Sequence, residues 1–123
     1  MDRESFEKLV EQAFELLPEN FRQALDNVSI VVEDYPTEEI VEKMNLKSAK
    51  QLLGLYQGVP KTHRGTWYGM SPVLPDTISL FQKSIEGICR DDEAVKVKVK
   101  EVLIHELGHY FGMDEDEIKN AGY

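Results

Sequence analysis

The segment His105-Glu106-Leu107-Gly108-His109 constrains this chain most, because its two histidines can act together only if the segment is helical. Residues four apart on a helix share one face, with Cβ atoms roughly 5–6 Å apart. At that separation both imidazoles can reach one zinc ion at about 2.0–2.1 Å. Glu106 flanks the same face, where it can reach a metal-bound water without itself binding the metal. The pattern therefore predicts a helix with two metal ligands, His105 and His109, and a candidate general base, Glu106.

The residues around this motif favour a functional site over a solvated helix that carries these side chains by chance. A histidine pair and a glutamate on a mostly buried helix indicate a specific role, because buried polar groups without partners destabilise a fold. Gly112 follows where a left-handed residue can end the helix and turn the chain back. The apolar neighbours that predict burial are Val102, Leu103, Ile104, Leu107, Tyr110 and Phe111.

A third metal ligand is expected from the acidic cluster that follows Gly112. In the extended pattern H-E-x-x-H-x-x-G-x-x-E the ligand stands three residues after the glycine, which is Glu115. A shift of one residue in the turn would present Asp114 or Asp116 instead, and Glu117 would have to reach further. The cluster also fits the acidic start of a short helix over residues 115–120. Glu115 is the leading candidate, with Asp114 and Asp116 as alternates.

Length, charge and cysteine content narrow the class of protein. With 123 residues, the chain is expected to form one domain over residues 1–123. No apolar run approaches the ~20 residues of a membrane span, and no secretory signal is expected, because the first residues lack an apolar stretch. A single cysteine, Cys89, fits a reducing compartment, so a cytoplasmic location without membrane association is expected. The net charge of −9 argues against nucleic-acid binding.

The sequence pattern of the first half of the chain predicts short helices and two strands. Apolar residues at three-and-four spacing predict an amphipathic helix over residues 3–17, stopped by Pro18, with a second short helix through Leu25. A β-branched run predicts a strand at Val28–Glu33. Thr37 is expected to cap a further short helix. A second strand is expected at Leu52–Tyr56, broken by Gly54.

A loop rich in glycine and proline occupies Gln57–Pro75 and is a candidate wall of a cleft. Within it, Trp67–Tyr68 could form a short edge strand, and His63 could contact substrate, although an exposed loop histidine is the ordinary interpretation. A third strand is expected at Thr77–Gln82. Tyrosines at 68, 110 and 123 could donate to an oxyanion, and the one at 110 fits packing better.

Residues 95–100 present a conflict, because valine and lysine alternate there as in a strand. Val95, Val99 and Leu103 also lie on one helical stripe that continues into the motif, and no helix breaker intervenes. Because the motif requires a helix, one helix is predicted over Asp92–Phe111. Gly108 inside it costs roughly 1 kcal/mol relative to alanine, which suggests that it permits close backbone approach by a neighbouring element near the metal.

These features together resemble the small, single-domain zincin-like metallopeptidases of bacteria, the minimal zincins. The resemblance implies an α+β fold in which a sheet of three to four strands packs on the long H-E-x-x-H helix and an N-terminal helix. It also implies zinc bound by His105 and His109, with Glu106 as the catalytic residue. The family usually has aspartate where this chain has Glu115. The segments that carry the resemblance are 17–21, 28–33, 53–60, 74–78 and 105–112.

The leading functional hypothesis is hydrolysis of peptide bonds by a zinc-activated water, with a peptide or protein substrate. An extended peptide is expected to add beside an edge strand near Trp67–Met70 or Thr77–Gln82. One alternative is a non-catalytic zinc-binding or protein-interaction module. A second is metal-dependent RNA hydrolysis, since rRNA-maturation proteins share the ligand spacing, but the acidic charge disfavours it. Substrate specificity and oligomeric state have no signature in the sequence.

Overall fold

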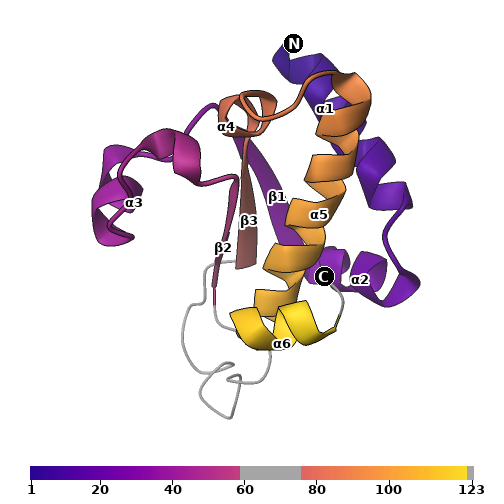
Figure 1. The fold of residues 1–123 in the computed structure, drawn as a ribbon. Coiled ribbons are helices and arrows are strands. Elements are labelled where there is room, and N and C mark those ends of the chain that lie inside the picture. Colours follow the sequence, from indigo (N-terminus) through magenta and orange to yellow (C-terminus); the bar gives the residue numbers. More distant parts are fainter. Residues whose placement is uncertain (59–75, 122–123) are drawn as a thin grey trace.

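The structure, a computed structural model, describes residues 1–58 and 76–121. Its helices lie around a small sheet (Figure 1). The elements, in chain order, are α1 (Arg3–Glu15), α2 (Glu19–Ala24), the 3-10 turn η1 (Leu25–Asn27), β1 (Val28–Glu33), α3 (Glu38–Lys43), the 3-10 turn η2 (Ala49–Gln51), β2 (Gly54–Gln57), β3 (Asp76–Phe81), α4 (Gln82–Glu86), α5 (Asp92–Tyr110) and α6 (Glu115–Asn120).

The sheet has three strands in the order β1-β3-β2. β1 pairs with β3 in parallel, with Val28 opposite Asp76, and β2 pairs with β3 antiparallel, with Gly54 opposite Leu80. The expectation that Thr77–Gln82 could serve as an edge strand is wrong, because β3 is paired on both sides. In the part of the chain that the structure describes, the strand beside the motif helix with an open edge is β2.

The second strand also begins later than predicted, at Gly54 instead of Leu52. The glycine does not break this strand. It lets the strand approach α5, since a Cβ at position 54 would stand 2.5 Å from Cγ1 of Val102 and 3.1 Å from the carbonyl oxygen of Ser79. The two residues before it lead out of η2, and the carbonyl of Leu53 accepts from the N–H of Phe81 at 2.9 Å.

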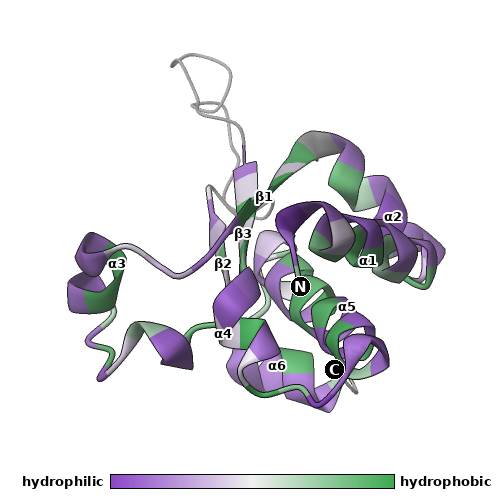
Figure 2. Ribbon diagram, turned by 90° about the horizontal axis from the view of Figure 1, so that it is seen from above, coloured by the Kyte–Doolittle hydropathy of each residue, from purple (hydrophilic) through white to green (hydrophobic). Residues whose placement is uncertain are grey.

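Two helices, α1 and α5, lie side by side against the sheet (Figures 1 and 2). Val99, Leu103 and Leu107 of α5 are fully buried, whereas Val97 on the opposite side is 47% exposed. The helical stripe therefore prevails over the alternating pattern of residues 95–100. The predicted α+β architecture is confirmed, with a three-stranded mixed sheet packed on the motif helix and the N-terminal helix.

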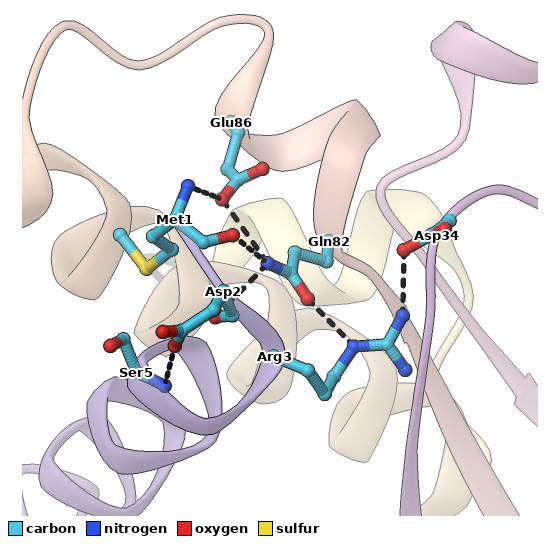
Figure 3. A network of polar contacts seen from close by, with 7 residues as sticks. All are labelled: Met1, Asp2, Arg3, Ser5, Asp34, Gln82 and Glu86. Carbon is cyan, nitrogen blue, oxygen red and sulfur yellow. Dashed lines mark hydrogen bonds and ion pairs between the residues drawn. The ribbon is translucent and has the colours of Figure 1, made fainter.

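The start of α1 is tied to the sheet by a network around Arg3 (Figure 3). Its guanidinium donates to the side chain of Gln82 at 2.7 Å, to the carbonyl of Val32 at 2.6 Å and to Asp34 at 2.6 Å. Gln82 is buried, and its amide group donates in turn to the carbonyl of Met1 at 2.9 Å. Because both groups are satisfied, burying them here costs little, and the network holds α1 beside the ends of β1 and β3.

Several local predictions hold. Thr37 caps α3, and its hydroxyl oxygen accepts from the N–H of Ile40 at 3.3 Å. The helix expected over residues 115–120 is α6. Among the described residues, no helix combines the length and apolarity that crossing a membrane requires. The expectations for His63, Trp67–Tyr68, Trp67–Met70 and Tyr123, and for most of the Gln57–Pro75 loop, fall on residues outside the described part of the chain.

Candidate metal site

The last two turns of α5 place both motif histidines on one side of the helix. The ring centroids of His105 and His109 lie 5.2 Å apart, and each side chain keeps about 30% of its surface exposed. The imidazoles are therefore open to solvent, although the helix that carries them is largely buried. Its apolar face anchors the backbone, so that the spacing of the rings is set by rigid structure.

Glu115, the first residue of α6, lies beside these rings. One carboxylate oxygen lies 3.0 Å from Nε2 of His109, and the other lies 2.9 Å from Nε2 of His105. One nitrogen from each histidine and one oxygen of Glu115 all lie within 4.8 Å of one another. Tetrahedral ligands at about 2.0–2.1 Å from a zinc ion stand roughly 3.3 Å apart, so this donor set fits a metal ion.

A tight reversal between α5 and α6 produces this convergence. Gly112 has a φ of 83°, in the left-handed region that favours glycine. The N–H of Met113 donates to the carbonyl of Gly108 at 3.0 Å, and the N–H of Gly112 donates to that of His109 at 2.9 Å. These two bonds form a Schellman motif, which turns the chain so that Glu115 faces the helix it has just left.

Gly108 lets α6 pack directly on α5. A Cβ at this position would stand 2.8 Å from Cγ1 and 2.9 Å from Cδ1 of Ile118, which is 1% exposed. The sequence suggested close backbone approach by a neighbouring element near the metal; in the structure that element is α6, and its atoms nearest to Gly108 belong to the side chain of Ile118. The contact matters for the site because Ile118 and Glu115 share the short helix α6.

The other acidic residues of the cluster have different surroundings. Asp114 caps α6, its Oδ1 accepting from the N–H of Glu117 at 2.8 Å, while Glu117 accepts from the N–H of Asp114 at 3.3 Å. This reciprocal pair is a capping box, which satisfies two helix-terminal donors. Neither residue, nor Asp116, belongs to the group of donor atoms formed by the two histidines and Glu115.

His109 has an acceptor at each ring nitrogen. Its Nδ1 lies 3.0 Å from the carbonyl oxygen of Met113, and its Nε2 lies 3.0 Å from Glu115. A neutral imidazole carries only one N–H. If Nδ1–H donates to Met113, the lone pair of Nε2 faces a carboxylate and needs a cation, either a proton or a metal ion, between them. A backbone carbonyl at Nδ1 is also the usual partner that orients a metal-binding histidine.

Glu106 lies beneath the histidines and is buried, with 8% of its surface exposed. The N–H of Tyr56, on the edge strand β2, donates to its Oε1 at 2.9 Å. Desolvation raises the pKa of Glu106, while the Tyr56 hydrogen bond and the two histidines lower it and Glu115 raises it further; the net shift is upward. A carboxylate with a raised pKa is a better proton acceptor than an ordinary one.

Glu115 differs from Glu106 in electrostatic setting. Its partial desolvation would raise its pKa, but the hydrogen bonds and charges of His105 and His109 outweigh this effect and lower the pKa of Glu115. Its side chain is 60% exposed. Two glutamates at one site are thus tuned in opposite directions, one as an ionised partner of the imidazoles and the other as a buried group able to exchange a proton.

The candidate site opens into a cleft of about 650 Å³. The cleft runs between α5 and β2, and the α5–α6 turn and the end of α3 complete its walls. It is lined by Met44, Leu52, Gly54, Leu55, Tyr56, Gly58, His105, Glu106, His109, Gly112, Met113, Asp114 and Glu115.

Sequence reasoning missed the contributions of Tyr56 and Met113, because both act through backbone atoms, which leave no residue signature. Met44 was also missed, and its only signal was an apolar side chain after a polar helix. Tyr110, considered as an oxyanion donor, is 4% exposed and packs edge-to-face on Tyr56 at a centroid distance of 6.0 Å. The packing interpretation of Tyr110 therefore agrees with the structure.

The fold and this donor set define an α+β protein with an H-x-x-x-H plus glutamate site. The chain belongs to the zincin-like metallopeptidase family, whose sequence model matches residues 25–123. Among solved structures it is similar to a conserved hypothetical protein from T. thermophilus, with a TM-score of 0.56 and 24% identity over 98% of each chain. At that identity the likeness shows the fold alone. No curated protein matches the chain.

Proposed function

We propose that this protein is a zinc-dependent metallopeptidase that hydrolyses peptide bonds, with His105, His109 and Glu115 as the metal ligands. The observation that carries the proposal is the convergence of two imidazole nitrogens and one carboxylate oxygen within 4.8 Å at the floor of an open cleft. Two histidines and a glutamate form a known catalytic zinc set, which leaves the fourth position open for water or substrate. Bound zinc would supply Lewis-acid chemistry, lowering the pKa of water and polarising the scissile carbonyl.

Glu106 is the general base in this proposal. The N–H of Tyr56 holds its Oε1 at 2.9 Å, so the carboxylate has a defined orientation, and Oε2 is the oxygen to which a proton would pass. Burial raises the pKa of Glu106, which favours uptake of a proton from the attacking water and its transfer to the leaving amine. Glu106 lines the same cleft as the proposed ligands His105 and His109, so the base sits beside the reacting atoms.

The substrate is proposed to bind as an extended peptide beside β2. Among the described residues, this strand is paired with β3 on one side and has no strand on the other, and it lies against the motif helix. Peptides add to exposed strand edges through main-chain hydrogen bonds, with alternate side chains entering pockets. The same strand therefore positions Glu106 through Tyr56 and offers its edge to the substrate.

The test compares the wild-type protein with Glu106→Gln on a broad peptide library, and Glu93→Gln at the exposed start of the same helix serves as the control. The Glu106→Gln variant should keep its metal and lose turnover by about 10²-fold or more, while Glu93→Gln should match the wild type. Retained hydrolysis in Glu106→Gln would refute the role of that residue. Bound metal without cleavage of any peptide by the wild type would favour a binding module.

A further inference from the structure

One wall of the cleft beside the metal site is apolar and comes from three separate segments. Met44 and Leu52 lie on the arm between β1 and β2 that carries α3. Leu55 comes from β2, and Met113 comes from the turn between α5 and α6. Single apolar residues on a surface need no explanation, but these four converge on the cavity that also contains the two motif histidines.

The hydrophobic core does not hold α3 itself in place. No residue of α3 is buried, and α3 projects away from α1 and α2 in both views (Figures 1 and 2). Met44, which closes α3, is 43% exposed. The arm is nevertheless held in place, because its ends are hydrogen-bonded to α4. The N–H of Lys83 donates to the carbonyl of Asp34 at 3.0 Å, and the hydroxyl of Ser84 donates to the carbonyl of Ala49 at 3.2 Å.

We propose that Met44, Leu52, Leu55 and Met113 form an apolar subsite that binds a large hydrophobic side chain of a peptide beside the bond to be cleaved. This inference rests on the proposed peptidase function and specifies its substrate class. Two of the four residues are methionines, whose flexible and polarisable side chains adapt to ligands of different shape. The subsite therefore accepts leucine, methionine and phenylalanine alike and discriminates against small polar and acidic side chains.

Binding to the Glu106→Gln protein tests the subsite without relying on turnover. Dye-labelled peptides of glycine and serine that differ at one central residue are titrated with this variant, with and without added zinc, and followed by fluorescence anisotropy. Peptides with leucine, methionine or phenylalanine should bind at least about tenfold more tightly than the serine peptide, as expected for burial of one such side chain. The aspartate peptide should bind no better than the serine peptide.

Variants of the arm connect this preference to Met44. In the same Glu106→Gln background, Met44→Lys should bring the leucine peptide close to the affinity of the serine peptide, whereas Met44→Leu should keep the preference. Ile88→Lys is the matched control, since Ile88 is an exposed apolar residue, 59% accessible, that does not line the cleft. It should leave every affinity unchanged.

The outcomes separate this inference from the proposed function. Equal affinities for all peptides, no measurable binding, or a preference that survives Met44→Lys would each overturn the subsite, even if the wild type cleaves peptides. A hydrophobic preference lost in Met44→Lys would support it, even if the wild type cleaves nothing. In that last case the peptidase proposal fails, and the cleft remains a peptide-binding groove.

Discussion

The backbone N–H of Tyr56 donates a 2.9 Å hydrogen bond to Oε1 of Glu106, across the contact between β2 and α5. This bond joins the proposed general base to the strand beside which a substrate would lie. It depends on Gly54, two residues earlier, because only a residue without Cβ allows the strand to approach Val102 so closely. Gly54, which the sequence pattern indicated only as a break in the strand, thus controls the geometry of the site.

Gly54→Ala should therefore weaken both stability and turnover. Its Cβ would stand 2.5 Å from Cγ1 of Val102, and relief of such overpacking typically costs about 1–3 kcal/mol. Shifting β2 should also lengthen the Tyr56–Glu106 bond. Adding Val102→Ala removes the nearer of the two obstructing atoms, so the double variant should be less destabilised than the sum of the single variants. Additive losses in chemical denaturation would contradict this explanation.

Gly108→Ala should weaken the free energy of zinc binding by more than it lowers the free energy of unfolding. The new Cβ would stand within 2.9 Å of two atoms of Ile118, and the simplest relief moves α6, which carries Glu115. We expect about tenfold weaker zinc binding, since loss of supporting contacts costs roughly 10–100-fold. Gly108→Ala/Ile118→Ala removes both obstructing atoms and should recover part of the affinity. Full affinity in Gly108→Ala, measured by competition with a chelating dye, would exclude this role.

The acidic cluster should divide into one ligand, Glu115, a capping pair, Asp114 and Glu117, and Asp116, which has neither role. Glu115→Gln should cause the largest loss of zinc affinity, because it removes the carboxylate charge beside both histidines. Asp114→Ala removes a helix cap worth about 1 kcal/mol and should weaken binding only by about fivefold. Asp114→Asn keeps the cap, and Asp116→Asn touches no donor atom, so both should bind as the wild type does. A larger loss in either asparagine variant than in Glu115→Gln would transfer the ligand role.

Asp2 should make stability depend on acid pH. The hydrogen bond from the backbone N–H of Ser5 lowers the pKa of Asp2 at the start of α1. Because the folded-state pKa lies below the unfolded one, the stabilisation is complete above the ordinary aspartate pKa and disappears as the pH falls through the folded value. Asp2→Asn should melt below the wild type at pH 7, and the difference should shrink as the pH falls below the ordinary aspartate pKa. A constant difference in melting temperature would contradict the assignment.

The sequence predicted the elements whose causes are local. The motif spacing and the stripe through Val99 and Leu103 indicated α5, and Thr37 and Gly112 marked helix ends by their own side-chain and backbone chemistry. What it could not supply was the pairing of distant segments. Whether the segment after Thr77 is central or at an edge depends on which strands flank it. The contact of Tyr56 with Glu106 joins residues 50 positions apart through a backbone atom.

The candidate site divides in the same way. His105, Glu106 and His109 follow from one helical repeat, and Glu115 from the usual distance after the glycine turn. The sequence left Asp114 and Asp116 open because a shift of one residue would exchange them. Only the folded turn distinguishes them, because in it the carboxylate of Asp114 accepts a hydrogen bond from the N–H of Glu117. The sequence pattern did not predict the apolar wall around Met44, because its residues come from segments that are far apart in the sequence and adjoin only in the folded chain.

In our proposal, two imidazoles and one carboxylate hold a metal ion in this cleft. The decisive experiment measures the metal content, by elemental analysis, of the wild type loaded with zinc and then dialysed free of excess, beside His105→Ala and the control Lys100→Ala on the same helix. We expect about one zinc per chain in the wild type and the control, and a large loss in His105→Ala. Zinc absent from the wild type, or retained in full by His105→Ala, would contradict it.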